Sequence, residues 1–210
     1  MYACAAVMHD GAVTATKPEN RRVLGVILIV AASIVGLVAC VAVVLYIYAA
    51  AFDRAFVTPS QSMCPTICQG ERFLANMYAY QLTGPQRGDV IMLEVPQLEL
   101  HTLLVKRVVG MPGDTVESGP HGQVVVNGEP LKPARTCGVP MTSHNSAAEL
   151  PDFPRTTVPK GFLFVVGDNL ADSNDSRFPG FGLVDLSQVR GKPEFIYWST
   201  GKSRIGCSIR

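Results

Sequence analysis

Charged residues are scarce in this sequence, and over one long stretch they are missing. They make up 17% of the 210 residues, and the segment 23–52 has none. A run of this length exceeds the ~20 apolar residues that cross a bilayer core, and the core helices of soluble proteins rarely extend so far without a charge. The absence argues against an ordinary soluble chain and predicts a single transmembrane anchor over residues 23–52.

A removable export signal is the alternative interpretation of this segment. The apolar core of a secretory signal spans only about 7–15 residues. The sequence Leu37-Val38-Ala39-Cys40 is similar to the cleavage box of a lipoprotein, but twelve more apolar residues follow Cys40. A mature lipoprotein would become polar at that point, so an uncleaved anchor is favoured.

Charges on either side of the anchor predict its orientation. Lys17, Arg21 and Arg22 precede it, whereas Asp53 and Arg54 follow it and cancel. By the positive-inside rule, residues 1–22 form a cytoplasmic tail and residues 53–210 an exported domain. We therefore expect a single-pass protein of the plasma (inner) membrane, in contact with lipid, with its domain on the periplasmic or extracellular side.

Histidine is also rare, and no cysteine or histidine spacing is typical of a zinc site. The four histidines are scattered along the chain. The acidic stretch that starts at Asp168 lacks the glycine and the final acid that a calcium loop of the EF-hand type requires. The net charge of +1 gives no electrostatic reason for a nucleic-acid partner. We expect no metal, no cofactor and no nucleic acid.

Four of the six cysteines fall in the predicted exported domain, where disulfides can persist. They are Cys64, Cys68, Cys137 and Cys207. Four cysteines permit three pairings, and the sequence does not choose among them. Cys64 and Cys68 are therefore either free thiols or a local constraint.

Short runs of β-forming residues, separated by glycine and proline, fill residues 53–210. Strands are expected at 89–95, 103–109, 123–126, 162–166 and 195–198. Asn127-Gly128 predicts a type I′ hairpin turn, and Pro112-Gly113 predicts a type II turn. Because no helical periodicity of comparable strength occurs, the fold class is predicted to be mostly β: coiled antiparallel sheets behind one N-terminal transmembrane helix.

Two serines lie close together just after the anchor, in a segment that we call the serine segment (residues 58–66, TPSQSMCPT). Prolines on both sides restrict its backbone. In an extended segment, residues two apart face the same side, so Ser60 and Ser62 can act together. One hydroxyl could attack a carbonyl while the other stabilises the oxyanion, although a plain proline- and serine-containing linker has the same composition.

A lysine stands among apolar neighbours in the strand predicted at 103–109. Strand alternation places Lys106 on one face with Leu104 and Val108. Loss of hydration there would lower the lysine pKa, and a neutral amine can take a proton from a serine hydroxyl. The alternative is an ordinary lysine with a packed stem and a solvated head.

Four sequence motifs occur in the order found in the type I signal peptidases, which the chain resembles over nearly the whole exported domain. They are SQSMCPT at 60–66 with Gly70 after it, RGDVI at 87–91, KRVVGMPGD at 106–114, and GDN at 167–169 with Ser173, Asp175, Ser176 and Arg177. We call residues 167–177 the acidic loop. The resemblance implies the fold of that family and a membrane-bound serine endopeptidase that cleaves the signal peptides of exported preproteins without a cofactor.

The resemblance also assigns roles to individual residues. It implies that Ser62 is the nucleophile, that Lys106 is the general base and that the Ser60 hydroxyl helps to bind the oxyanion. Ser173 corresponds to the serine that orients the lysine. Asp175 and Arg177 correspond to a supporting pair.

The last motif departs from the family pattern: Leu170 stands where arginine is usual, and Ala171, Asp172 and Pro179 also differ from the commonest sequence. Two alternatives accompany the leading interpretation. The chain could be a specialised peptidase for components of a secretion or conjugation apparatus. It could also be a non-catalytic, membrane-anchored assembly factor with the same fold.

Overall fold

The computed structural model describes residues 18–51, 54–95, 103–132 and 152–209. It divides into two compact units, Met1–Tyr48 and Ala49–Arg210. Each unit is treated by itself.

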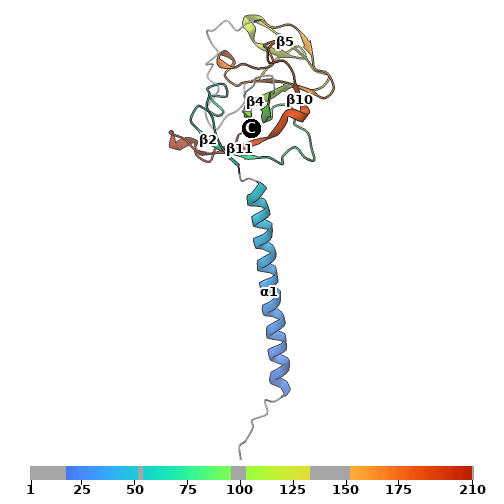
Figure 1. Ribbon diagram of the computed structural model, residues 1–210, viewed down its shortest axis with the longest axis vertical. Helices are drawn as coiled ribbons and strands as arrows, with labels where there is room; N and C mark the ends of the chain where they lie inside the picture. Colours follow the sequence, from blue (N-terminus) through green and yellow to red (C-terminus); the bar gives the residue numbers. More distant parts are fainter. Residues whose placement is uncertain (1–17, 52–53, 96–102, 133–151, 210) are drawn as a thin grey trace, which may run out of the picture. The chain divides into compact units, whose positions relative to one another are not determined.

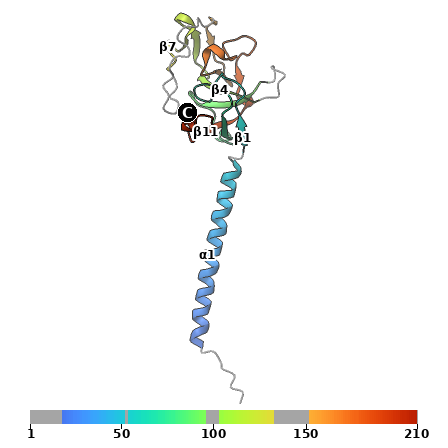
Figure 2. The ribbon, with the colours of Figure 1, turned by 90° about the vertical axis from the view of Figure 1, so that its left-hand side faces the viewer.

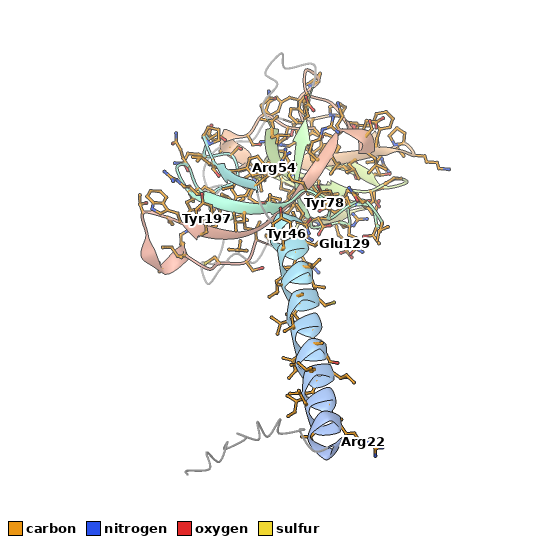
Figure 3. The ribbon with its side chains drawn as sticks, turned by 60° about the horizontal axis from the view of Figure 1, so that its bottom comes forward. Arg22, Tyr46, Arg54, Tyr78, Glu129 and Tyr197 are labelled. Carbon is orange, nitrogen blue, oxygen red and sulfur yellow. A yellow bond between two sulfur atoms is a disulfide. The ribbon has the colours of Figure 1, made fainter. Side chains whose placement is uncertain are left out.

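The described part of the N-terminal unit is helical and belongs to one long helix, α1, which spans Pro18–Ala51 (Figure 1). Its stretch Arg22–Tyr48 has a mean hydropathy of 3.0 and is long and apolar enough to cross a membrane. Figure 3 shows side chains projecting all around the helix between Arg22 and Tyr46, and those described are almost all exposed. The hydroxyl of Ser33 donates to the carbonyl of Ile29 at 2.9 Å, so the helix itself satisfies this polar group.

The C-terminal unit is mostly β, as predicted, and contains two antiparallel sheets. The larger sheet has the strand order β1-β2-β11-β3-β4-β9-β10. Its strands are β1 (Arg54–Val57), β2 (Arg72–Asn76), β3 (Val90–Glu94), β4 (Leu103–Gly110), β9 (Phe162–Val166), β10 (Val184–Asp185) and β11 (Val189–Trp198). In the views of Figures 1 and 2, β4 lies well inside this unit.

The smaller sheet has the order β7-β6-β5-β8. Its strands are β5 (Thr115–Ser118), β6 (Val124–Val126), β7 (Glu129–Pro130) and β8 (Thr156–Thr157). Four short 3₁₀ helices complete the elements described: η2 (Pro120–Gly122), η3 (Leu170–Asp172), η4 (Leu186–Gln188) and η5 (Lys202–Arg204).

The strands predicted from the sequence all form, with small shifts at their ends. The expected strand 195–198 is the end of the much longer β11, which pairs with both β2 and β3 and carries three register irregularities. Such irregularities increase strand twist, which agrees with the expectation of coiled sheets. Asn127 and Gly128 have φ values of 53° and 83°, as a type I′ turn requires.

Alternating strand residues fill three apolar clusters. The first includes Met63 and Ile67 together with Phe73 and Ile196, so the chain around the serine segment is anchored in the core. The other two lie on either side of β4 and β9: one contains Val108 and Leu163, the other Val109 and Phe164. The core therefore fixes both the serine segment and β4.

Candidate active site

The serine segment is not extended, contrary to the assumption from which the pairing of its serines was predicted. After β1 the chain bends and then forms consecutive turns. The amide of Cys64 donates to the carbonyl of Gln61 at 3.0 Å, and that of Ile67 donates to Met63 at 2.9 Å. The two serines nevertheless meet, because the bend brings the hydroxyl oxygens of Ser60 and Ser62 to 3.1 Å.

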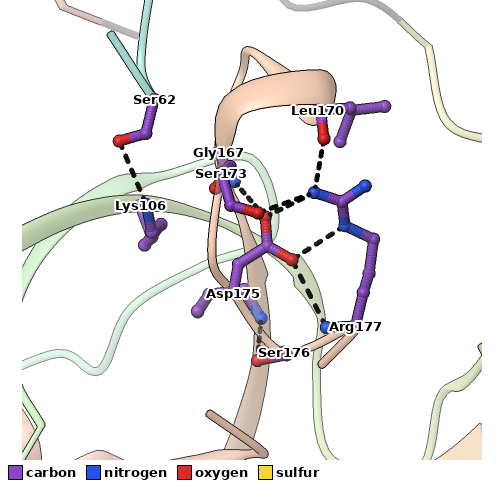
Figure 4. A network of polar contacts seen from close by, with 9 residues as sticks. Ser62, Lys106, Gly167, Leu170, Ser173, Asp175, Ser176 and Arg177 are labelled. Atoms are coloured by element: carbon purple, nitrogen blue, oxygen red, sulfur yellow. Dashed lines mark hydrogen bonds and ion pairs between the residues drawn. The ribbon is translucent and has the colours of Figure 1, made fainter. Parts of the chain in front are cut away.

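Lys106 reaches the serine segment from β4, 44 residues along the chain. Its Nζ donates a hydrogen bond of 3.1 Å to the Oγ of Ser62 (Figure 4). The lysine is only 4% exposed, although it carries a charge in its ordinary state. The register of β4 against β3, with Lys106 opposite Ile91, holds the lysine backbone in place.

Burial makes Lys106 a much weaker base than lysine is in water. Loss of hydration lowers its pKa from 10.5 to about 8, and the nearby charge of Arg177 acts in the same direction. The carboxylates of Asp175, Asp168 and Asp172 oppose this effect. At pH 8 about half of the molecules then carry a neutral amine at this position, against well under about 1% for an unperturbed lysine.

Asp175 and Arg177 form a fully buried ion pair within the acidic loop. The guanidinium Nε donates to Oδ1 of Asp175 at 2.8 Å, and Nη2 donates to Oδ2 at 2.9 Å. Arg177 also donates to the carbonyls of Leu170 and Ser173, and Asp175 accepts from the amide of Gly167. Figure 4 shows that this network fixes the course of the loop beside the Ser62–Lys106 pair.

Ser173 lies next to the serine segment, but it makes no hydrogen bond to Lys106. Its buried Oγ has no hydrogen-bond partner among the described residues. A Cβ on Gly167 would come within 2.3 Å of this oxygen and within 2.4 Å of the Ser62 carbonyl oxygen. The structure thus brings Ser173 close to Ser62 without the lysine contact expected for an orienting residue.

Asn169 is a contact residue that the sequence analysis did not single out. Its amide donates to the carbonyl of Ser62 at 3.0 Å, and its side chain donates to the carbonyl of Gln61 at 3.3 Å. The acidic loop therefore holds the backbone of the serine segment directly. The position of Asn169 in the GDN motif was the available signal.

A hydrogen-bonded cluster around Arg107 and Asp168, which the sequence analysis did not predict, joins all four sequence motifs. Arg107 donates to both carboxylate oxygens of Asp168 at 2.7 Å and to the carbonyl of Gly88 at 2.6 Å. Thr66 donates to Asp168 and accepts from Arg107. Arg107 and Asp168 are almost completely buried. Through the contacts of this bidentate pair, the motifs at 87–91 and 106–114 are connected with the serine segment and the acidic loop.

The edge of β4 next to the serines is open along part of its length. Residues 103–107 pair with β3, but β9 pairs only from Arg107 onward, so within the described ranges residues 103–106 have one strand neighbour. A small cavity of about 60 Å³ lies between this part of β4 and the end of β1, and both Ser62 and Lys106 line it. An extended peptide has backbone groups available there and room for a small side chain.

A disulfide bond links the end of the serine segment to the residues that follow it. Cys64 and Cys68 form a disulfide, which settles the question of free thiols for these two residues. Cys207 is disulfide-bonded as well, whereas Cys137 lies outside the described residues. Across the part of the chain that the structure covers, no three His, Cys, Asp or Glu side chains gather in a way that would hold a metal ion.

Comparison with known proteins gives consistent matches. The family model described as "Signal peptidase, peptidase S26" matches residues 29–198. A probable signal peptidase I of Mycobacterium leprae is 28% identical over 90% of this chain and 81% of its own. Signal peptidase I of Bacillus licheniformis is 32% identical over 78% and 87% of the two chains, and signal peptidase IB of Staphylococcus aureus is 35% identical over 74% and 83%.

Among solved structures, a signal peptidase I of Enterococcus faecalis aligns with 51% of this chain and 95% of its own. The two are 29% identical in sequence, and the TM-score is 0.39.

Proposed function

The chain belongs to the signal peptidase family of S26 peptidases, and on that basis we propose that it cleaves the signal peptides of exported preproteins with Ser62 as nucleophile and Lys106 as general base. It is a serine endopeptidase. The observation that carries the assignment of residues is the 3.1 Å hydrogen bond between Lys106 Nζ and Ser62 Oγ, made by a buried lysine whose pKa is lowered to about 8.

The proposed reaction starts from the neutral amine. Lys106 accepts the hydroxyl proton of Ser62 as Oγ attacks the carbonyl carbon of the scissile peptide. The resulting ammonium then gives that proton to the leaving amine when the peptide bond breaks. An ester links the signal peptide to Ser62, and a water molecule, deprotonated by the same lysine, hydrolyses it.

The oxyanion is proposed to be stabilised by the hydroxyl of Ser60 and the backbone N–H of Ser62. Ser60 lies within hydrogen-bond distance of the attacking oxygen, so a hydroxyl that rotates slightly can reach the developing negative charge. Donors fixed in advance at such a position contribute a large part of the rate acceleration in acyl transfer.

Ser173, Asp175 and Arg177 are proposed to support the dyad. The buried Asp175–Arg177 pair shapes the acidic loop beside Lys106, and the charges of both residues act on the lysine pKa. Ser173 has an unpaired buried hydroxyl close to Ser62, and we propose that this hydroxyl orients Lys106 when substrate is bound.

Substrate is proposed to bind as an extended strand. The open edge of residues 103–106 offers backbone hydrogen bonds, and the end of β1 lies across the small cavity. The family resemblance implies small side chains at the −1 and −3 positions of a preprotein, and the cavity of about 60 Å³ beside the dyad admits only a small side chain at −1. A phenylalanine or leucine at −1 should therefore block cleavage.

The family is membrane-anchored, and α1 is the apolar helix that serves as anchor. The flanking charges support a cytoplasmic N-terminus and a catalytic unit on the opposite, periplasmic or extracellular side. The interaction of α1 with lipid follows from its exposed apolar surface. This placement brings the dyad to the side of the membrane on which signal peptides are cleaved from exported chains.

Cleavage of purified preproteins tests the proposal. Wild type, Ser62→Ala and Lys106→Met are compared in detergent, with circular dichroism to establish that each variant is folded. Each substitution is expected to lower kcat by at least about 10³-fold, because the two groups act as one unit. Equal activity of the three proteins would refute the dyad, and an inactive wild type across many preproteins would favour the specialised peptidase or the assembly factor.

A further inference from the structure

The cavity beside the dyad has walls of mixed chemistry. Apolar side chains, among them Phe73, Met92 and Leu104, form most of its lining. Ser62 and Lys106 form the polar end where the reaction takes place. Its volume of about 60 Å³ corresponds to roughly two water molecules. By size alone, the cavity admits the side chains of alanine and serine and excludes larger ones, but it does not discriminate between alanine and serine.

Thr58 adds a further polar group to this cavity, in addition to Ser60, Ser62 and Lys106. It lines the cavity from the position directly after β1 and is only 5% exposed. Its amide donates to Glu71 at 3.0 Å, and its carbonyl accepts from Gly70 at 2.8 Å. The side-chain hydroxyl is buried and has no hydrogen-bond partner within the described residues.

A buried hydroxyl without a partner is unfavourable, so a ligand that supplies one is favoured over a ligand that does not. Threonine is branched at Cβ, and rotation about χ1 exchanges the positions of its hydroxyl and its methyl group. Thr58 can thus present either group to the cavity. Its backbone hydrogen bonds to Glu71 and Gly70 keep the Cα in place during this rotation.

We propose that Thr58 is a specificity-determining residue whose hydroxyl binds the hydroxyl of a serine at the −1 position of the preprotein. The inference rests on the proposed function. Position −1 follows from the lining of the cavity, because Ser62 and Lys106 act on the carbonyl of the −1 residue and also border the space into which its side chain enters. An alanine at −1 fills the cavity but leaves the Thr58 hydroxyl unpaired.

Matched substrates test this assignment with the full-length protein in detergent. Two preprotein-derived peptides differ only in serine or alanine at −1, and a second pair differs in the same way at −3. The ratio of kcat/KM for serine over alanine at −1 is expected to fall about three- to tenfold in Thr58→Val, because one hydrogen bond is lost while the side-chain shape is kept. Thr58→Ser retains the hydroxyl and should keep the wild-type preference.

The outcomes are separable. An unchanged ratio in Thr58→Val, or a change confined to the −3 pair, would overturn the inference while the proposed function stands. Failure of wild type to cleave any of the four peptides would overturn both. If Thr58→Val does not fold, the comparison of Thr58→Ala with Thr58→Ser measures the same loss of a hydroxyl, and equal ratios in those two variants would be decisive against the proposal.

Discussion

At the scale of single residues, the chemistry of this protein depends on the environment of one lysine. Lys106 is buried among apolar strand neighbours, and the cost of burying its charge exceeds the attraction of the surrounding carboxylates. In the proposed mechanism, the neutral amine accepts a proton from the Ser62 hydroxyl, to which it is hydrogen-bonded. The same side chain on a solvated strand would stay protonated and inactive as a base.

The pH dependence of activity should report this environment. In the proposed mechanism Lys106 acts in its deprotonated form, and its pKa is about 8. The ratio kcat/KM should therefore rise about tenfold per pH unit below pH 8 and level off above it. Cleavage rates measured from pH 6 to 10 in a constant ionic strength would show the inflection. Asp172→Asn removes a charge that raises this pKa and should move the inflection to lower pH, whereas an optimum in the acidic range would exclude a lysine base.

Gly167 is a residue whose missing side chain matters for the site. A Cβ at this position would lie 2.3 Å from Ser173 Oγ and 2.4 Å from the Ser62 carbonyl oxygen, so Gly167→Ala must displace the serine segment. A displacement of about 1 Å at the nucleophile is expected to reduce kcat/KM about 100-fold. Gly180→Ala is the matched control, because nothing lies within 4 Å of its Cβ position; similar activity of both variants would contradict this account.

At the scale of elements, the site is assembled where β4, the serine segment and the acidic loop meet. Lys106 and Arg107 are neighbours on β4, yet one contacts Ser62 and the other Asp168. This is the alternation of a strand, in which consecutive side chains point to opposite faces. One strand therefore supplies both Lys106, the proposed base, and the buried arginine that holds the acidic loop in place.

Removal of Asp168 should destabilise the C-terminal unit. Asp168→Ala leaves the buried guanidinium of Arg107 without its carboxylate, and loss of one partner from such a pair costs about 3–5 kcal/mol. Urea unfolding in detergent, followed by the fluorescence of Trp198, measures the change. Glu117→Ala removes the half-buried partner of the exposed Arg155 and should cost at most about 1 kcal/mol. Comparable losses in both variants would argue against a special role for the buried pair.

At the scale of the whole molecule, an apolar helix and a β unit with a reactive dyad lie in one chain. The helix carries no charge between Arg22 and Asp53, so its side chains suit a bilayer and not water. Under the proposed function, this tether places the catalytic unit at the membrane surface where the signal peptides of preproteins emerge. Tethering both partners to one surface raises their effective concentration.

The orientation across the membrane is open to a direct test. The positive charges of Lys17, Arg21 and Arg22 predict that a tag at the N-terminus is protected from external protease in spheroplasts, while a tag at the C-terminus is digested. Permeabilised cells should lose both tags. Digestion of the N-terminal tag in intact spheroplasts would show the opposite orientation.

The sequence by itself predicted the long apolar helix, the positions of five strands, and Ser60, Ser62 and Lys106 as residues of one site. These properties depend on local composition: an uncharged run, alternation in strands, turn residues such as Asn127-Gly128, and four motifs in a specific order. Local patterns could not show that the serine segment bends, that Cys64 pairs with Cys68, or that the Ser173 hydroxyl is left without a partner.

Only the tertiary structure decided which distant groups touch and how strongly burial acts on them. The bond between Ser62 and Lys106 spans 44 residues, and that between Arg107 and Asp168 spans 61. A lysine pKa of about 8 arises from the loss of water around it, and hydration is a property of packing in three dimensions that no neighbour in sequence can specify.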